Sequence, residues 1–350
     1  MSAKTRVFIV YPGHGTATID VARGLHSGFL ANDCEVTPFL LHAQAAWFGG
    51  LLSSDKAIPE ELKTDASFVL AASAIPAAVL RSNKPDLIVV VHGLLVPEPI
   101  WESLQIIGQS ICPVHLVCTE CPYQDADIRR IAPYATNIWA NDAYSARDNG
   151  WYYLPAAYDP ERHHPPDEPI AGCPDLLFVG TGWPERVEFL RSVNFGALGL
   201  RIVGPEYSWA AAEGTDLEKC IETCTIPGPA LWAYYAGSGA VLNMHRTCRS
   251  ILGDSDKEDP VQGYSLNPRC YQVPACGGLL LSDYRPEWDD VFGACLRPWK
   301  DAEDLGDMAR ILVGNPELRA EIIGRTMEAV KPHTYHERAA QILESATAKG

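Results

Sequence analysis

Short apolar runs alternate with helical stretches in the first half of the chain. Arg6-Val-Phe-Ile-Val-Tyr11 is a β-type run, and a glycine-containing turn leads from it to a helix-like segment, Ile19 to Ala31. Asp86-Leu-Ile-Val-Val-Val-His92 is continuously apolar, as strands of a parallel sheet are when both faces are buried, and Asn83-Lys-Pro85 before it signals a turn. Two more strands are expected at 114–118 and 137–140. This order of strand, loop and helix predicts a doubly wound α/β domain.

The same pattern begins again in the second half. The predicted strands there are 175–180, 200–204, 239–243 and 278–283, and the predicted helices are 185–193, 317–331 and 333–348. The fold class that we expect is therefore α/β, with two Rossmann-like domains facing an interdomain cleft. A chain of 350 residues is about the right length for two such domains.

A proline-rich segment separates the two patterns. Between Pro155 and Pro174 the chain has six prolines, the pair His163-His164 and little periodicity, which is typical of a connection. We place the boundary near residue 168, with an N-terminal domain at 1–168 and a C-terminal domain at 169–332. The last segment, 333–350, follows Pro332, and we expect its helix to cross back to the N-terminal domain.

The charge balance argues against binding to nucleic acid by charge alone. The formal net charge is −16, and residues 1–165 have 11 basic against 17 acidic side chains, which leaves 17 against 27 in the remainder. Such a chain repels phosphate backbones at long range, although a local basic groove remains open.

The sequence also predicts a cytoplasmic protein. Met1 to Arg6 lead into the first strand without the apolar region of a signal peptide, and no apolar run approaches the roughly 20 residues that span a bilayer. We expect the 11 cysteines to be reduced and packed in the core. Core packing is also preferred over a redox or zinc role for Cys118-Thr-Glu-Cys121, and neither His163-His164 nor the acidic segment 253–258 has the pattern of a metal site.

Polar residues follow the predicted strands of the first half. His92, Glu120 and Asp142 stand at three strand ends, where open α/β sheets bind ligands. Each is a candidate general base, and a structural polar role is the alternative for each. Gly13, His14 and Gly15 form the first turn, which fails the full G-x-G-x-x-G pattern of a dinucleotide site.

The turn after the first strand of the second half has the composition of a phosphate site. In Phe178-Val-Gly-Thr-Gly, the residues Gly180, Thr181 and Gly182 would let a diphosphate approach backbone N–H groups and a helix N-terminus. Arg186 would add a charge-assisted contact. A plain tight turn with an exposed arginine is the alternative.

Four stretches of the second half, taken together, resemble the CgeB-like (spore maturation protein) family of GT-B glycosyltransferases, with a C-terminal domain of the glycosyl transferases group 1 type. They are Phe178 to Arg186, Val241-Leu-Asn-Met-His-Arg246, Asn267-Pro-Arg-Cys-Tyr-Gln-Val-Pro-Ala-Cys-Gly-Gly278 with the following strand, and His333-Thr-Tyr-His-Glu-Arg338. The first half has weaker likenesses at Thr119 to Tyr123, Asn141-Asp142 and Tyr153 to Pro155.

The resemblance implies that the third stretch holds the diphosphate and ribose of a nucleotide sugar. Arg269 would then be the cation that binds the pyrophosphate, with a salt bridge to a nearby carboxylate as the alternative. Gln272 stands where related sequences have a glutamate for the ribose hydroxyls, so a charge-assisted bond becomes a neutral one. The other donor-side candidates are Asn243, His245, Asn267, Tyr271, Gly277 and Gly278. His245 has a helix cap as its alternative role.

The function that we expect is transfer of a sugar from a nucleoside-diphosphate sugar to an acceptor hydroxyl, without a cofactor or bound metal. The resemblance implies that Gly13, His14 and Gly15 lie on the acceptor or sugar side. A general base among His92, Glu120 and Asp142 would fit an inverting reaction. The acceptor stays open between a small molecule, a glycan, a protein and a modified nucleobase, and the oligomeric state stays open too. A nucleotide-sugar epimerase on the same fold and a non-catalytic nucleotide-sugar-binding protein are the alternatives.

Overall fold

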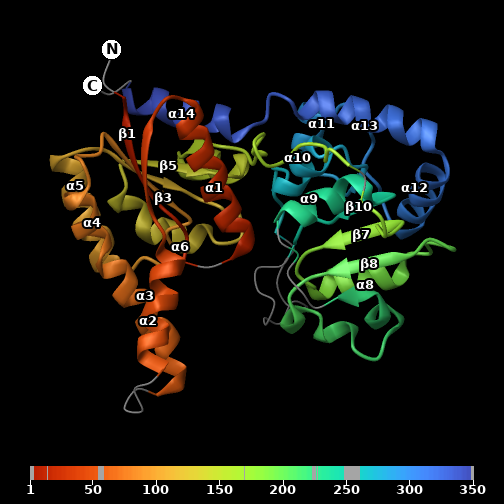
Figure 1. Cartoon of the computed structure of the whole chain (residues 1–350), viewed down its shortest axis with the longest axis horizontal. Helices are drawn as coiled ribbons and strands as arrows, with labels where there is room; N and C mark the ends of the chain where they lie inside the picture. Colours follow the sequence, from red (N-terminus) through yellow and green to blue (C-terminus); the bar gives the residue numbers. More distant parts are fainter. Residues whose placement is uncertain are drawn as a thin grey trace. The chain divides into compact units, whose positions relative to one another are not determined.

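The computed structural model describes residues 4–13, 15–53, 59–168, 170–222, 226, 228–247 and 261–347 (Figure 1). The chain divides into two compact units, 1–155 with 335–350 and 156–334. The division therefore falls after Pro155, earlier than the boundary expected near 168. The proline-rich segment belongs to the second unit because it packs there: His163 lies edge-on against Trp232 at 4.9 Å, and Tyr158 forms a β-bridge with Thr334.

The first unit is built on a six-stranded parallel sheet. Its order is β2 (Glu35–Phe39), β1 (Arg6–Val10), β3 (Leu87–Val91), β4 (Val114–Val117), β5 (Asn137–Ala140) and β6 (Tyr152–Tyr153). All five residues of β3 are buried, as the continuous apolar run predicts. The strand order reverses between β1 and β3, and the carboxyl ends of these two strands form the switch point at which such sheets bind ligands.

Helices complete this unit. They are α1 (Thr16–Ala31), α2 (Leu41–Ser53), α3 (Glu60–Ser73), α4 (Ile75–Arg81), α5 (Glu98–Ser110), α6 (Asp125–Ile131), α7 (Ala143–Asn149) and α14 (Tyr335–Thr347), with a short 3₁₀ turn at Ala132–Tyr134. Helices α2 and α3 form the antiparallel orange pair that extends away from the sheet in Figure 1.

The terminal helix α14 belongs to the first unit and packs on α1. Gly24 and Gly28 allow the close approach, because a Cβ at these positions would lie 2.1 Å from the Tyr335 ring and 2.2 Å from the Tyr335 carbonyl oxygen. Asn32 also donates a hydrogen bond to the His336 carbonyl (2.9 Å). The final helix thus joins the unit that contains the N-terminus.

The second unit contains a five-stranded parallel sheet. Its order is β11 (Leu280–Ser282), β10 (Ala240–Asn243), β7 (Leu176–Val179), β8 (Leu200–Val203) and β9 (Ile221–Glu222). The helices are α8 (Pro184–Ser192), α9 (Gly228–Gly237), α10 (Pro268–Ala275), α11 (Glu287–Val291), α12 (Ala302–Gly314) and α13 (Pro316–Val330), with 3₁₀ turns at Glu206–Ser208, Ala210–Ala212 and Asp216–Cys220. The order reverses between β7 and β10, so the switch point of this sheet lies at Gly180 and Met244.

One helical stretch of the described chain, Leu62–Arg81, is long and apolar enough, by length and composition only, to pass for a membrane span. It is two helices, α3 and α4, which meet at Ala74. Its first helix packs along α2, as two helices of a folded domain do.

Candidate functional site

The turn after β7 differs from the phosphate loop that the sequence suggests. The Gly180 N–H donates to the Val203 carbonyl (2.8 Å), and the Gly182 N–H donates to the Ser208 hydroxyl (3.0 Å). Helix α8 begins with Pro184, which has no N–H, and the Arg186 N–H already bonds to the Trp183 carbonyl. Most of the expected backbone donors are therefore engaged within the unit, and side chains must provide the positive charge.

Gly180 and Gly182 are glycines for different reasons. A Cβ on Gly180 would point at two cations, 3.3 Å from Nη2 of Arg269 and 3.6 Å from Nη1 of Arg186. A Cβ on Gly182 would instead lie 2.4 Å from the Trp209 ring. Gly180 thus leaves room beside the guanidinium groups, whereas Gly182 lets the turn pack on Trp209.

Arg269 lies at the N-terminal turn of α10 and reaches across to the end of β7. Its Nη1 donates to Asn243 Oδ1 (2.6 Å) and its Nη2 donates to the Val179 carbonyl, while the guanidinium lies 5.7 Å from the centre of the Phe178 ring. Both acceptors are neutral, and no carboxylate forms an ion pair with Arg269 among the described residues. The arrangement disagrees with the salt-bridge alternative and leaves a positive charge next to Gly180.

Arg186 lies beside the same ring but is more enclosed. Its side chain donates to the carbonyls of Thr181 (3.0 Å) and Met244 (2.6 Å), and only 7% of the residue is exposed. The guanidinium is 5.7 Å from the Phe178 ring centre. Arg186 therefore ties the β7 turn to the end of β10 and adds charge from below the surface, in contrast to the exposed arginine of the alternative interpretation.

The Asn243 side chain bonds to several other side chains and has no exposed surface for a donor molecule to contact. It is fully buried; its amide donates to Ser282 Oγ (2.8 Å), and its Oδ1 accepts from Asn267 Nδ2 (2.9 Å) as well as from Arg269. This one side chain joins β10, β11 and the start of α10. Its role is to hold Arg269 in place.

His245 is buried too, and both of its ring nitrogens are used. Nδ1 lies 2.6 Å from Asp283 Oδ1, and Nε2 accepts from the Asn267 backbone N–H (3.3 Å). Burial by itself would raise the pKa of the Asp283 carboxyl, but the His245 ring and its hydrogen bonds outweigh burial and lower this pKa. The expected contact of His245 with a phosphate or sugar is thus replaced by a structural contact with Asp283, and the ring also bonds the residue that precedes α10.

Asp283, Ser282 and Cys270 complete this network, although the sequence pattern did not single them out. Asp283 and Ser282 end a buried strand, the same signal that selected His92 and Glu120, so the strand-end rule could have found them. Cys270 offered no such signal, because it lies within a helix and not at a strand end. It is fully buried, and burial raises the pKa of its thiol.

The remaining donor-side candidates are Tyr271 and Gln272 within α10, and Gly277 and Gly278 after its C-terminal end. Gln272 is partly exposed one turn beyond Arg269, so the two side chains share a helix face. Tyr271 is fully buried and packs near His333 (5.3 Å between ring centres). Gly277 and Gly278 lie before β11, at its amino end, because they turn the chain from α10 into the strand; a Cβ on Gly278 would lie 2.3 Å from the Tyr235 carbonyl. These two glycines are at the opposite edge of the sheet from Gly180.

In the first unit, His92 directly follows β3 and Glu120 lies just beyond β4. His92 is buried with a φ of 69°, unusual for a residue with a side chain, and its Nδ1 lies 3.0 Å from Thr119 Oγ1. Glu120 is partly exposed at the end of β4. Backbone strain of this kind often accompanies a functional position.

Asp142 has a structural task. Its Oδ1 accepts the N–H groups of Tyr144 (2.9 Å) and Ser145 (3.2 Å), which makes it the N-cap of α7, and it is 2% exposed. Such bonds, which a carboxylate oxygen accepts from the first N–H groups of a helix, are typical of an N-cap residue. The structural alternative accounts for Asp142 better than the base does.

The first turn packs on its own unit. A Cβ on Gly13 would lie 2.6 Å from Leu95, in the loop that follows His92, so this glycine brings the ends of β1 and β3 together. Gly15 has a φ of 86° and precedes α1. His14 and the segment 253–258 lie outside the described residues.

Cys118 and Cys121 are both buried and free, and hydrogen bonding between them, together with burial, raises the pKa of Cys121. Within the described ranges, no group of three or more His, Cys, Asp or Glu side chains is arranged to hold a metal ion.

The chain is similar to a known protein family and to several solved structures. Residues 175–344 match the family model described as glycosyl transferase-like. An α-glucosyltransferase solved with UDP and a 13-mer DNA is 14% identical, with a TM-score of 0.67 over 99% of this chain and 100% of the other. Anabaena HepE, solved with UDP-glucose, is 10% identical, with a TM-score of 0.62 over 98% and 99%.

A putative UDP-N-acetylglucosamine 2-epimerase from Listeria monocytogenes is similar as well, at 12% identity and a TM-score of 0.53 over 98% and 95%. No curated protein matches the sequence significantly. The fold is GT-B, and the matched region, just under half of the chain, covers most of the second unit and most of α14; together these findings support a glycosyltransferase.

Proposed function

We propose that the second unit binds a nucleoside-diphosphate sugar with its diphosphate against Gly180 and Arg269. The observation that carries this proposal is the position of Arg269, whose charge lies beside the side-chain-free face of Gly180 and is bonded only to neutral oxygens among the described residues. A guanidinium in this state suits two non-bridging phosphate oxygens. The solved neighbours that contain UDP or UDP-glucose favour a uridine nucleotide.

In this proposal the leaving diphosphate is neutralised by Arg269, with Arg186 beneath it, rather than by a bound metal. Gln272 lies on the Arg269 face of α10, where its amide would meet the ribose hydroxyls. His92 and Glu120 are the candidates for a base on the acceptor hydroxyl. The four motifs of the second half support a CgeB-like enzyme of the cytoplasm as the finer assignment.

The test is a panel of nucleoside diphosphates and nucleotide sugars, with the melting temperature of the full chain as the readout. A ligand at 100 times its Kd stabilises the folded state by about 2.7 kcal/mol, which such a measurement detects. In the Arg269→Ala variant we expect donor affinity, and any donor hydrolysis, to fall at least about tenfold. Arg191→Ala, which removes an exposed arginine of α8, is the matched control. Equal affinity in wild type and Arg269→Ala would contradict the assignment.

Epimerisation is the second candidate, because the Listeria protein shares the fold. Incubation of the chain with a nucleotide sugar and no acceptor separates the two activities. A transferase at most hydrolyses the donor slowly, whereas an epimerase converts it to its isomer, which nuclear magnetic resonance of the sugar protons detects.

A further inference from the structure

A pocket of about 580 Å³ opens at the carboxyl end of β11, next to the network that holds Arg269. Asp283 ends the strand, and Trp299 pairs with Asp283 in a parallel bridge and donates its N–H to the Ser282 carbonyl (3.0 Å). β10 alone separates β11 from β7, so neighbouring-strand spacing puts the two strand ends about 10 Å apart. The pocket is thus at the same edge of the sheet as Gly180 but outside the predicted diphosphate position.

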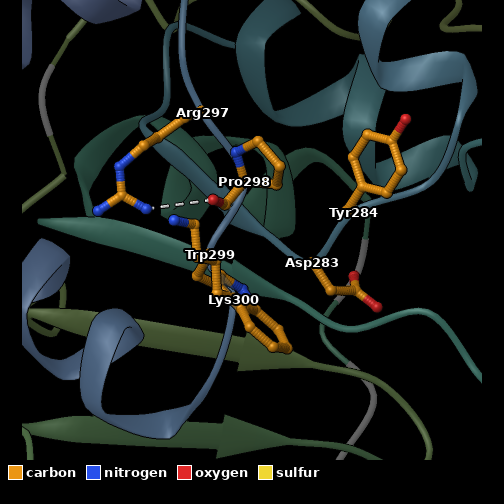
Figure 2. A pocket seen from close by; sticks show the side chains of 6 residues that line it. All are labelled: Asp283, Tyr284, Arg297, Pro298, Trp299 and Lys300. Carbon is orange, nitrogen blue, oxygen red and sulfur yellow. Dashed lines mark hydrogen bonds between the residues drawn. The ribbon is translucent and has the colours of Figure 1, made fainter.

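The charges that line the pocket nearly balance. Arg297 is neutralised by Asp304, to which it donates two hydrogen bonds of 2.6 Å. Lys300 adds a positive charge and Asp283 a negative one, and Figure 2 shows Arg297 and Lys300 on the opposite side of Pro298 from Asp283 and Tyr284. A phosphate-rich ligand would need an excess of cations, so these walls suit an uncharged ligand with many hydrogen-bonding groups.

An aromatic surface completes the pocket. Tyr284 is 50% exposed, and its hydroxyl donates to Asp289 (2.9 Å), which fixes the ring at the rim. Trp299 is 8% exposed and stacks on Phe189 of α8 at 4.6 Å, so it forms a rigid base. A flat apolar ring beside fixed donors and a carboxylate acceptor matches a sugar ring, which has an apolar C–H face and a rim of hydroxyls.

We propose that this pocket binds a neutral saccharide. Under the proposed function, on which this further step rests, that saccharide is part of the acceptor, so the acceptor is a glycan or glycoside and not DNA. The pyranose ring packs against Tyr284, and its hydroxyls donate to Asp283 and accept from Lys300 and Arg297. The pocket volume is within the range of small-ligand sites.

The experiment uses the labelled full chain on an array of neutral and acidic oligosaccharides, with a 13-base-pair duplex DNA as a separate arm. We expect binding to neutral glycans, reduced at least about tenfold in Tyr284→Ala and severalfold in Lys300→Gln. Tyr207→Ala is the matched control, because Tyr207 is 75% exposed in the same unit and does not line the pocket. Melting temperatures verify that each variant is folded.

Absence of glycan binding, equal binding by Tyr284→Ala, or a preference for acidic glycans or DNA would overturn the proposal. UDP titration of the same preparations keeps the two hypotheses apart. A chain that binds UDP but no glycan refutes the saccharide pocket alone, and a chain that binds glycans but no nucleotide refutes the donor site alone. We expect Tyr284→Ala to bind UDP like the wild type.

Discussion

The carboxyl edges of the two sheets are built differently. In the second unit, hydrogen bonds join the ends of β7, β10 and β11 and the start of α10 through Asn243, His245 and Arg269. In the first unit, the His92 ring lies 3.0 Å from the Thr119 hydroxyl and so joins the ends of β3 and β4, while Asp142 caps its own helix α7. A preorganised edge fixes a charged group before the ligand arrives. The difference teaches that the second unit fixes a guanidinium group at its sheet edge, whereas the described bonds at the first unit's strand ends hold a histidine and a helix cap.

The largest effect should come from His245→Ala, which breaks the second-unit network at the partly buried hydrogen bond between the His245 ring and the Asp283 carboxylate. Removal of the ring takes one hydrogen bond from the partly buried Asp283 carboxylate, which keeps its bonds to the backbone N–H of residue 245, so we expect a loss of about 2 kcal/mol in the free energy of unfolding. Urea denaturation of the full chain measures it. His164→Ala, at an exposed histidine of the same unit, should change little. A loss below about 1 kcal/mol in His245→Ala would mean that the network is not what stabilises this edge.

The same pair predicts an acid dependence. The pKa of Asp283 is lowered from its ordinary 3.8, so its stabilising contribution is present above that pH and is lost as the pH falls through the lowered value. Wild type should therefore lose more stability than His245→Ala between pH 5 and pH 2, roughly the interval in which carboxylates titrate. Denaturation midpoints measured at several pH values give the comparison, and parallel curves for the two proteins would contradict it.

Gly180→Ala should have the next largest effect, and on binding more than on folding. The added methyl group would lie 3.3 Å from Arg269 Nη2, in the space assigned to the diphosphate. We expect donor affinity to fall about tenfold, or about 1.4 kcal/mol, by isothermal titration with UDP. Gly324→Ala, at a helical glycine with nothing within 4 Å of the new Cβ, is the control. Unchanged affinity in Gly180→Ala would place the diphosphate elsewhere.

Asp142→Ala tests the first unit. Loss of an N-cap costs about 1 kcal/mol, and we expect a stability loss of this size with kcat essentially unchanged once an acceptor is in hand. Asp148→Ala, at an exposed aspartate of the same helix, is the control. A large fall in kcat without loss of stability would instead make Asp142 the base and the first unit's edge as specialised as the second's.

Gln272→Glu should have the smallest effect. A carboxylate accepts hydrogen bonds from ribose hydroxyls more strongly than an amide does, so we expect UDP to bind about threefold more tightly. Gln262→Glu adds the same charge at an exposed position of the same unit and should leave the affinity unchanged. Weaker binding in Gln272→Glu alone would show that this side chain faces the phosphates and not the ribose.

The sequence by itself determined the fold class, two α/β patterns with buried strands such as β3, and the strand ends where polar residues gather. Local periodicity and turn residues encode these features, because each depends on neighbours along the chain. The glycine motif after β7 could be selected in the same way, whereas Arg269 was selected through the resemblance of its stretch to a known family. The sequence could not predict that the proline-rich segment belongs to the second unit. This assignment depends on the packing of His163 on Trp232, and the two residues are distant in the sequence.

Only the tertiary structure decided which candidates face open space and which are already bonded. Asn243, His245, Asp142 and the Gly180 N–H all looked available in the sequence, and each is engaged by a group from another segment or by its own helix. Gly277 and Gly278 proved to be at the far edge of the sheet because a strand three residues long separates them from its carboxyl end. A buried polar group must find a partner, and which partner it finds is a property of the assembled fold.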